Sequence, residues 1–490
     1  MTGRRGIIGI VTMLFFGMAL AACGGGGSSS VSGGTGTTTI QGSVPGTVFV
    51  AVDNDTNLEV GRVTAAGTPK AFSMNVPTGK NYRFYVMENE GTANSRIYPM
   101  YVGANNVFEL DNTADGQIIS LGMVTPEMGT GRATPANTPS LMMSRGANAM
   151  VPPSLAGMAF SMDNVKGTTW GYNTVMTSGT RGWEHGTLSF DDNGLGHMTG
   201  IVRNGTSLSA REDIPYTMSL SGMLLNPDDN TFQCVVSKDR SVMVATFTDN
   251  IMGGPAMMIG QKRGGTFHPD GSDMTGTWRF QRLTAGSDNT TSGWAYGTME
   301  FVSGSAGITS ITTNSGSGTI ENFSFSMNDN GIMTEAGDGS FHGVMSMDKT
   351  MIVATDTNGG NPELWVMMKI PTGTYSTADM RGDWVMHSVS SGNAGSRDWT
   401  FGHSVVNSGG VDTFSQMMGS AGPVASAQMT FTMNGGVMTM SGQGGGMGGG
   451  MMGGGMMTQT FHGIMNGAKN IMVSNYSDGS GGYPFSIQVK

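Results

Sequence analysis

Residues 276–302 read GTWRFQRLTAGSDNTTSGWAYGTMEFV, and the two tryptophans in this stretch have counterparts in two other parts of the chain. The first tryptophans of the three copies are separated by 108 and 106 residues, and each second tryptophan opens a Trp-x-x-Gly motif. A constant period with matching landmarks indicates a tandem repeat. Six of the seven tryptophans of the chain are therefore interpreted as structural anchors, in two sets: Trp170, Trp278 and Trp384, and Trp183, Trp294 and Trp399.

The repeats divide the second part of the chain into three units of about 105 residues, which we place at 157–265, 266–371 and 372–490. Each unit contains about eight short apolar stretches separated by turn sequences such as Asp192-Asn193-Gly194, a pattern typical of antiparallel hairpins. No stretch has a convincing helical period, so we predict an all-β meander in each unit. A segment rich in glycine and methionine is inserted into the third unit at 441–457.

Eight antiparallel strands must protect their edges, and two closed arrangements do so. We predict one up-and-down barrel per unit; the alternative is a six-bladed propeller with two blades per unit. Gly276-Thr277-Trp278 and Gly382-Asp383-Trp384 resemble the opening of lipocalins and avidins, which implies a barrel, whereas the first unit departs with Gly167-Thr168-Thr169-Trp170. Residues 364–368 are apolar at every position, which favours a propeller blade covered on both faces.

Residues 38–124 contain short strands separated by proline, glycine and asparagine, and we predict a small β-sandwich there. The segments QGSVP at 41–45 and VPTGKNYRF at 76–84 resemble transthyretin-like and carboxypeptidase-regulatory sandwiches. That resemblance implies a spacer or adhesive module without catalytic residues. Residues 125–156 lose the alternation and become rich in proline, methionine, serine and glycine, so we interpret them as a linker.

The first 22 residues are typical of an export signal, because Arg4 and Arg5 precede an apolar run that ends in small residues. Leu20-Ala21-Ala22-Cys23 resembles the lipobox of bacterial lipoproteins, in which the cysteine is acylated and becomes the first residue of the mature chain. The resemblance implies a lipid anchor, with chains such as palmitate on Cys23, followed by a flexible tether at 23–37. Because Gly24 is not the aspartate that retains such proteins at the inner membrane, we expect an outer-membrane location.

The composition restricts the classes of partner. Removal of the signal changes the formal net charge from −10 to −12, and such acidity argues against nucleic-acid binding. Charged residues make up only 12% of the chain, which contains 80 glycines, so uncharged polar residues must contribute to solubility. Apart from Cys23 the only cysteine is Cys234, so no intramolecular disulfide is expected once Cys23 is acylated.

The sequence contains no clustered histidine, aspartate and serine in a catalytic arrangement, and we predict neither an enzyme nor a cofactor. His342 and His462 occupy equivalent places in two repeats, but Gln233 stands there in the first repeat, so we interpret them as structural. Residues 53–57 carry alternating oxygen ligands like a calcium loop; Leu58 and Thr64 stand where its glycine and glutamate belong, so we predict a surface turn.

The methionine-rich insertion offers soft thioether ligands that suit Cu(I). Methionine is abundant everywhere, at 45 residues, so we predict a low-complexity loop without metal and interpret strand methionines as adaptable core residues. The weak Cu(I) candidates are Met447, Met451, Met452, Met456 and Met457.

These observations favour a membrane-anchored envelope lipoprotein with a non-catalytic binding or structural role. Its partner would be a protein, a glycan or a small apolar ligand. The first alternative is a carrier that holds a small apolar ligand inside a barrel. A further alternative is an enzyme acting on envelope glycans, which would require paired carboxylates about 5 to 10 Å apart in a cleft.

Overall fold

The computed structural model describes residues 36–44, 48–67, 70–103, 105–111, 113–140, 142–146, 150–251, 253–302, 305–370, 373–440 and 461–490. These residues belong to one compact unit, Gly36–Lys490. The predicted signal 1–22, Cys23, nearly all of the tether and the five methionines of the insertion lie outside the described residues. Among the described residues, no helix has the length and apolarity that a membrane span requires.

The described chain is all-β, as predicted. It contains no α-helix among these residues, and its only helical segments are four short 3-10 turns. These turns are η1 (Met162–Asn164), η2 (Ser272–Met274), η3 (Thr377–Met380) and η4 (Ala394–Ser396).

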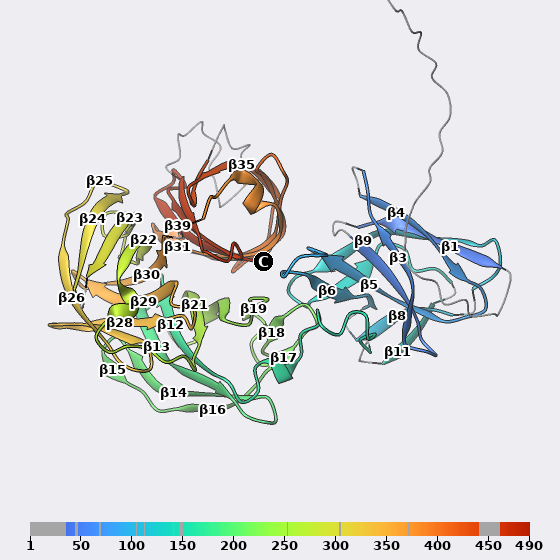
Figure 1. Ribbon diagram of the computed structural model, residues 1–490, viewed down its shortest axis with the longest axis horizontal. Helices are drawn as coiled ribbons and strands as arrows, with labels where there is room; N and C mark the ends of the chain where they lie inside the picture. Colours follow the sequence, from blue (N-terminus) through green and yellow to red (C-terminus); the bar gives the residue numbers. More distant parts are fainter. Residues whose placement is uncertain are drawn as a thin grey trace, which may run out of the picture. The chain divides into compact units, whose positions relative to one another are not determined.

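The N-terminal part consists of two sheets (Figure 1). One has the order β10-β9-β1-β4, in which β1 runs parallel to β9 and antiparallel to β4. Its strands are β1 (Thr37–Ser43), β4 (Ala71–Pro77), β9 (Ile118–Glu127) and β10 (Arg132–Pro135). The other sheet has the order β11-β8-β5-β2-β3, and β6 and β7 pair with β5 and β8. Its strands are β2 (Val48–Asp53), β3 (Leu58–Thr64), β5 (Tyr82–Glu88), β6 (Arg96–Pro99), β7 (Tyr101–Val102), β8 (Asn106–Leu110) and β11 (Met142–Gly146).

The two sheets enclose a common core, which the strand patterns explain. Strand β4 alternates buried and exposed residues and directs Phe72, Met74 and Val76 inward. Phe72 stacks on Phe49 of β2 at a ring-centroid distance of 4.1 Å. Strands β2 and β5 are buried at every position, because their other face is also covered. This part of the chain, which we call the sandwich, is thus built from one alternating and one fully covered sheet.

Residues 125–156 are not a linker, contrary to the prediction from their composition. Strand β10 pairs with β9, and strand β11 pairs with β8, so this segment supplies one edge strand to each sheet of the sandwich. Edge strands tolerate proline because one side of their backbone needs no partner, and Pro135 stands at the end of such a strand. Further along, Leu155 is fully buried, so the segment also contributes to a core.

The three repeats form three sheets with the same strand order, which we call barrel 1, barrel 2 and barrel 3. Barrels 2 and 3 are closed rings of eight strands, because the pairings β23–β24 and β32–β33 join the ends of the sheets. The structure therefore confirms up-and-down barrels and not propeller blades. Barrel 2 comprises β22 (Gly276–Thr284), β23 (Gly293–Val302), β24 (Ser305–Thr313), β25 (Gly316–Ser317), β26 (Asn322–Met327), β27 (Ile332–Glu335), β28 (Asp338–Met345), β29 (Met351–Asn358) and β30 (Asn361–Lys369). Barrel 3 comprises β31 (Gly382–Gly392), β32 (Trp399–Val406), β33 (Val411–Gly419), β34 (Gly422–Val424), β35 (Ala427–Asn434), β36 (Val437–Met440), β37 (Phe461–Met465), β38 (Ile471–Tyr476) and β39 (Gly482–Val489).

Barrel 1 differs from barrels 2 and 3 at one strand position. The position that β26 holds in barrel 2 is divided between β16, which pairs with β14, and β17, which pairs with β18, with Tyr216 between them. Barrel 1 comprises β12 (Thr169–Met176), β13 (Gly182–Phe190), β14 (Leu195–Arg203), β15 (Thr206–Ser207), β16 (Arg211–Pro215), β17 (Thr217–Met218), β18 (Met223–Leu225), β19 (Gln233–Val236), β20 (Val242–Asp249) and β21 (Gly254–Lys262).

The stretch at 364–368 shows why a barrel strand can be apolar on both faces. Trp365 and Met367 point into barrel 2, whereas Leu364, Val366 and Met368 belong to a second core that barrels and sandwich share. The outer face of the strand is thus buried by neighbouring sheets. This burial explains why the strand is apolar at every position, the pattern that favoured a propeller blade. The interiors themselves are rich in methionine, which fills irregular space, as predicted.

The three barrels contact one another in cyclic order. The first two strands of barrel 1 pack on β28, β29 and β30 of barrel 2, and those of barrel 2 pack on β37, β38 and β39 of barrel 3. The first two strands of barrel 3 pack in turn on β20 and β21 of barrel 1 (Figure 1). The second tryptophan of each repeat donates an indole hydrogen bond across each contact: Trp183 to Thr357, Trp294 to Ser477 and Trp399 to Thr248. We call this closed arrangement the barrel ring.

Candidate functional site

Barrel 1 contains a cavity of 140 Å³ beside the interruption at Tyr216. A cavity of about 150 Å³ is large enough for a benzene-sized molecule. Its wall combines apolar side chains with a charged end. The lining residues are Thr174, Met176, Glu184, Leu188, Met198, Arg211, Ile214, Tyr216, Asn226, Asp229, Phe232, Phe247, Asp249 and Met258.

The charged end of this cavity is organised around Glu184, which is 4% exposed. One of its carboxylate oxygens accepts hydrogen bonds from Arg203 at 2.9 Å and Arg211 at 2.6 Å, and the other accepts one from the Tyr172 hydroxyl at 3.0 Å. Burial raises the pKa of Tyr172, and the neighbouring carboxylate raises it further, so the phenol remains a donor. The buried carboxylate is thus fully hydrogen-bonded, as a charge in such a place must be.

The corresponding cavities inside the other two barrels are much smaller. The cavity between Phe325, Phe341 and Trp365 of barrel 2 measures 10 Å³, and the one beside Phe431 and Gln488 of barrel 3 measures 20 Å³. Such volumes hold about one water molecule. Only the cavity of barrel 1, among these three, could accept an organic ligand.

Three carboxylates lie close together in barrel 2, and two of them, Glu335 and Asp356, line its cavity. Oxygens of Glu335, Asp338 and Asp356 lie within 4.8 Å of one another. Burial raises the pKa of Glu335 to about 7, and the other two carboxylates add to this rise. Because the adjoining space measures 10 Å³, no sugar ring fits between them, and a glycosidase pair is not formed here.

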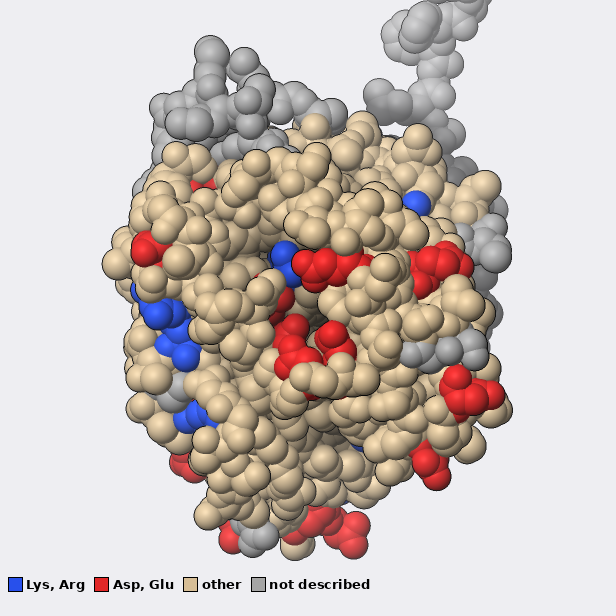
Figure 2. Space-filling model, turned by 90° about the vertical axis from the view of Figure 1, so that its left-hand side faces the viewer, with Lys and Arg blue, Asp and Glu red and all other residues tan. Residues whose placement is uncertain are grey.

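The molecular face drawn in Figure 2 is largely uncharged. One group of carboxylates borders a central hollow and others are scattered toward the edges of the face, while most of its lysines and arginines lie to one side. The scarcity of charge on this face agrees with the low content of charged residues in the sequence.

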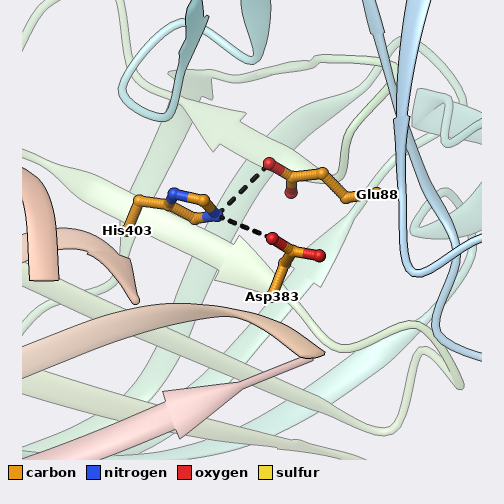
Figure 3. Close-up of side chains that lie close together, drawn as sticks. All are labelled: Glu88, Asp383 and His403. Carbon is orange, nitrogen blue, oxygen red and sulfur yellow. Dashed lines mark ion pairs between the residues drawn. The ribbon is translucent and has the colours of Figure 1, made fainter. Parts of the chain in front are cut away.

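A second group of ionisable side chains is buried where the sandwich meets barrel 3 (Figure 3). Glu88 ends strand β5, Asp383 lies near the start of β31 and His403 lies on β32; they are 1%, 4% and 1% exposed. His403 Nε2 lies 3.2 Å from Glu88 Oε1 and 3.6 Å from Asp383 Oδ1. Burial alone would lower the pKa of His403, but the two carboxylates outweigh it and raise the pKa to about 10. We call these three residues the junction triad.

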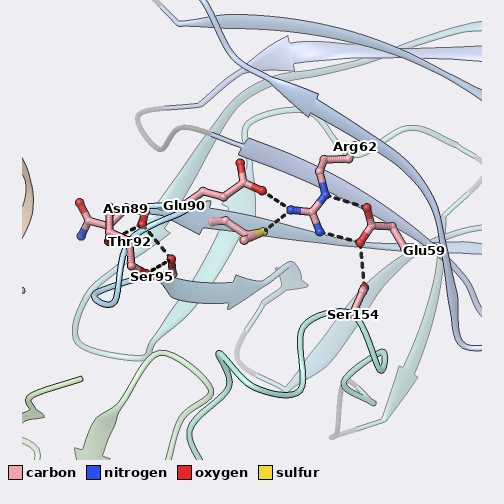
Figure 4. Close-up of polar contacts among 8 residues, drawn as sticks. Glu59, Arg62, Asn89, Glu90, Thr92, Ser95 and Ser154 are labelled. Atoms are coloured by element: carbon pink, nitrogen blue, oxygen red, sulfur yellow. Dashed lines mark hydrogen bonds and ion pairs between the residues drawn. The ribbon is translucent and has the colours of Figure 1, made fainter. Parts of the chain in front are cut away.

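The loop that follows Glu88 holds the triad in register. Asn89 adopts a φ of 52° and exchanges two hydrogen bonds of 2.9 Å with the backbone of Asp383. Hydroxyls of Thr92 and Ser95 donate to the Asn89 carbonyl at 2.7 and 2.8 Å (Figure 4). Asparagine tolerates this left-handed backbone better than most residues, so the loop can turn at this point.

A further ion pair fixes the loop from its other side. Arg62 binds Glu90 and donates two hydrogen bonds of 2.7 Å to Glu59, whose carboxylate also accepts one from Ser154 at 2.8 Å (Figure 4).

Arg96 of β6 is fully buried, and its guanidinium donates to carbonyls of barrel 1 and of Lys490. The sandwich is therefore fastened to two barrels by polar contacts as well as by the shared core.

The predicted anchor residues occupy two kinds of place. The first tryptophans, Trp170, Trp278 and Trp384, lie inside the barrels, and the second tryptophans lie at the contacts between barrels. His342 stacks on His185 across the contact between barrels 1 and 2, at a ring-centroid distance of 3.6 Å. His462 stacks on Tyr296 at the same distance across the next contact. Both histidines are thus packed between barrels.

Two further predictions concern Cys234 and the turn at 53–57. Cys234 is a buried free thiol inside barrel 1. Residues 54–57 form the predicted turn, but Asp53 before it is 1% exposed; it pairs with Lys80 and accepts a hydrogen bond from the amide of Asp55 at 2.9 Å. These bonds are an aspartate's usual role at a turn.

The junction triad was not predicted from the sequence. Its members stand far apart in the chain and none belongs to a recognised motif. One signal was nevertheless present: Asp383 and His403 replace threonines of the other repeats, since Thr169 and Thr277 precede the first tryptophans and Thr187 and Thr298 follow the second by four residues.

No protein-family model matches the chain, and no curated protein matches it. A mutant of transferrin-binding protein B from Haemophilus parasuis Hp5 aligns with 66% of this chain and 76% of its own, at 8% identity and a TM-score of 0.22. The isotype 1 transferrin-binding protein B of serogroup B Neisseria meningitidis aligns over 79% and 84%, at 8% identity and a TM-score of 0.22. A protein of unknown function from Nostoc punctiforme aligns over 66% and 95%, at 10% identity and a TM-score of 0.16. The strand pairings of the chain itself define its fold.

Proposed function

We propose that the protein is a lipoprotein of the cell envelope, anchored through Cys23, whose barrel ring has a non-catalytic binding or structural role. The observation that carries the proposal is the ring itself. Its three barrels share a buried core and are joined by an indole hydrogen bond at each contact, an arrangement suited to presenting a continuous surface. The lipobox resemblance supports the anchor, and the outer membrane is the expected location.

Metabolic labelling with a palmitate analogue tests the anchor. The wild-type chain should incorporate the label and fractionate with membranes, and Cys23→Ser should do neither. The matched control is Cys234→Ser, which removes the buried thiol and should behave like the wild type in both measurements. Equal labelling of the Cys23→Ser chain would contradict the proposed anchor.

The role of the barrel ring is tested in cells that lack the gene and carry either the full chain or a chain without 157–490. Loss of envelope adhesion, assembly or uptake in the second strain, with the shortened chain still present by immunoblot, is the expected result. Unchanged behaviour in all three assays would count against a role for the ring.

A second candidate function is the carriage of a small ligand, and the 140 Å³ cavity of barrel 1 favours it. The apolar wall and charged end suit a compact aromatic molecule with one polar group, so phenol is a suitable probe. Saturable binding of phenol to the full chain, with shifted resonances of Tyr216 and Phe232, would support this candidate. Absence of binding by titration calorimetry and by NMR would reject it for this class of ligand.

A further inference from the structure

The junction triad has the composition and spacing of a metal centre. Glu88 Oε1, Asp383 Oδ1 and His403 Nε2 lie within 4.8 Å of one another. Each atom is buried, and apart from the two ion pairs that join His403 to the carboxylates none of them makes a hydrogen bond. Buried polar atoms nearly always make hydrogen bonds, so three that make none and face one point form a place where a bound ion would complete the contacts.

The distances fit a divalent cation of the zinc type. In a tetrahedral site with bonds of about 2.1 Å, neighbouring ligand atoms are about 3.4 Å apart. The separations of His403 Nε2 from Glu88 Oε1 and Asp383 Oδ1 are 3.2 and 3.6 Å. One imidazole nitrogen and two carboxylate oxygens form a ligand set that such ions accept. A dication would also neutralise the two carboxylates in a place that water does not reach.

The repeats show that these side chains are specific to one copy. The equivalents of Asp383 are Thr169 and Thr277, and the equivalents of His403 are Thr187 and Thr298. A threonine at both positions is therefore compatible with the barrel fold. Only in barrel 3 do the two positions face Glu88 of the sandwich. The requirements of the barrel thus do not account for Asp383 and His403.

We propose that Glu88, Asp383 and His403 bind one divalent metal ion, with zinc as the best-fitting class, that fastens the sandwich to barrel 3. The ion joins residues that are about 300 positions apart in the chain, as a disulfide would, and the described residues contain only a single free cysteine. Asn89 acts as a positioning residue, because its two hydrogen bonds to the Asp383 backbone set the distance between the two carboxylates.

The test uses the full chain in detergent, without a histidine tag, after removal of metals with EDTA. Zinc is then added and followed by competition with a chromogenic chelator and by thermal unfolding. One equivalent should bind, and it should raise the unfolding temperature. Asp383→Asn should weaken zinc binding by more than the 10- to 100-fold that is typical for loss of an outer-shell partner, and Asn89→Ala should weaken it by about that factor.

The matched control is Glu335→Gln, which alters the other cluster of acidic residues in barrel 2 and should leave zinc binding unchanged. If Asp383→Asn does not fold, X-ray absorption of the zinc-loaded wild type decides, because one imidazole and otherwise oxygen ligands are expected. Absence of saturable zinc uptake by the wild type would overturn the proposal and leave the triad as an ion pair around His403. Loss of uptake in Glu335→Gln but not in Asp383→Asn would overturn it equally.

Discussion

The indole nitrogen of Trp399 donates a hydrogen bond of 2.9 Å to the hydroxyl of Thr248, and this bond joins the last barrel to the first. Trp399 is only 4% exposed, so its side chain is largely shielded from bulk water. The hydrogen bond lies within the contact of β31 and β32 with β20 and β21, which closes the ring of three barrels. The Trp-x-x-Gly motif thus marks a contact between repeats as well as a place within each repeat.

Replacement of Thr248 by valine keeps the shape of the side chain and removes the acceptor. The indole N–H of Trp399 would then be buried without a partner, at a cost of about 1–3 kcal/mol in the free energy of unfolding. Thr64→Val, at an exposed position of β3, should change stability by less than about 0.5 kcal/mol. Denaturant unfolding monitored by circular dichroism measures both; equal stabilities of the two variants would contradict the prediction.

Gly382→Ala should loosen the attachment of the sandwich. Gly382 has a φ of 131°, and an added Cβ would lie 2.7 Å from Asn89 Oδ1. Both effects act on the loop that holds Asp383, and a strained backbone of this kind costs about 1–3 kcal/mol. The control is Gly395→Ala, where an added Cβ meets no atom within 4 Å and should leave thermal stability near that of the wild type. An unchanged melting temperature for Gly382→Ala would show that this contact does not hold the sandwich.

The carboxylate cluster of barrel 2 should make stability depend on pH. The pKa of Glu335 is raised from 4.5 to about 7, so the folded state binds more protons than the unfolded state between these values. The free energy of unfolding therefore falls as pH rises from about 4.5 to 7. Glu335→Gln removes this loss of stability. At pH 8 the free energy of unfolding of the variant should exceed that of the wild type by roughly 1 kcal/mol, a figure that is reduced because solvent screens a partly exposed group.

The pH dependence is measured by urea unfolding at pH 5 and pH 8. The exposed carboxylate Asp163 provides the control, because Asp163→Asn should follow the wild-type profile. A stability difference between wild type and Glu335→Gln that stays constant over this range would contradict the assignment.

Cys234 should resist alkylation in the folded protein. Its side chain is fully buried, and burial raises the pKa of the thiol, so very little reactive thiolate is present at neutral pH. Mass spectrometry after iodoacetamide should find Cys234 unmodified in native protein and modified in urea. Rapid modification under native conditions would show that barrel 1 opens readily.

The fold could be predicted where the sequence repeats. Tryptophans at a constant period and alternating apolar strands predicted three barrels, because both signals act within one repeat. The prediction for 125–156 was wrong, since proline and methionine are as suitable for the edge strands β10 and β11 as for a linker. The strand at 364–368 is apolar on both faces, and the sequence could not assign it to a barrel or to a propeller blade. The sheets that bury its outer face are distant in the chain.

The candidate sites were harder to predict than the fold. Each member of the junction triad is a single polar residue in a strand, and only tertiary packing brings 88, 383 and 403 together. The cavity of barrel 1 depends on an interrupted ladder at Tyr216, which leaves no local pattern in the sequence. A comparison of the repeats with one another, position by position, was the one available signal for Asp383 and His403.

The ring closure between barrels 3 and 1 is tested most directly by NMR of protein labelled with ¹⁵N-tryptophan. The Trp399 indole signal is assigned with Trp399→Phe, and its hydrogen exchange is compared in wild type and Thr248→Ala. We expect slow exchange in the wild type and faster exchange in Thr248→Ala for Trp399 alone, with Trp183 and Trp294 unaffected. Rapid exchange of the Trp399 indole in the wild type, or an exchange rate that Thr248→Ala does not change, would contradict a closed ring.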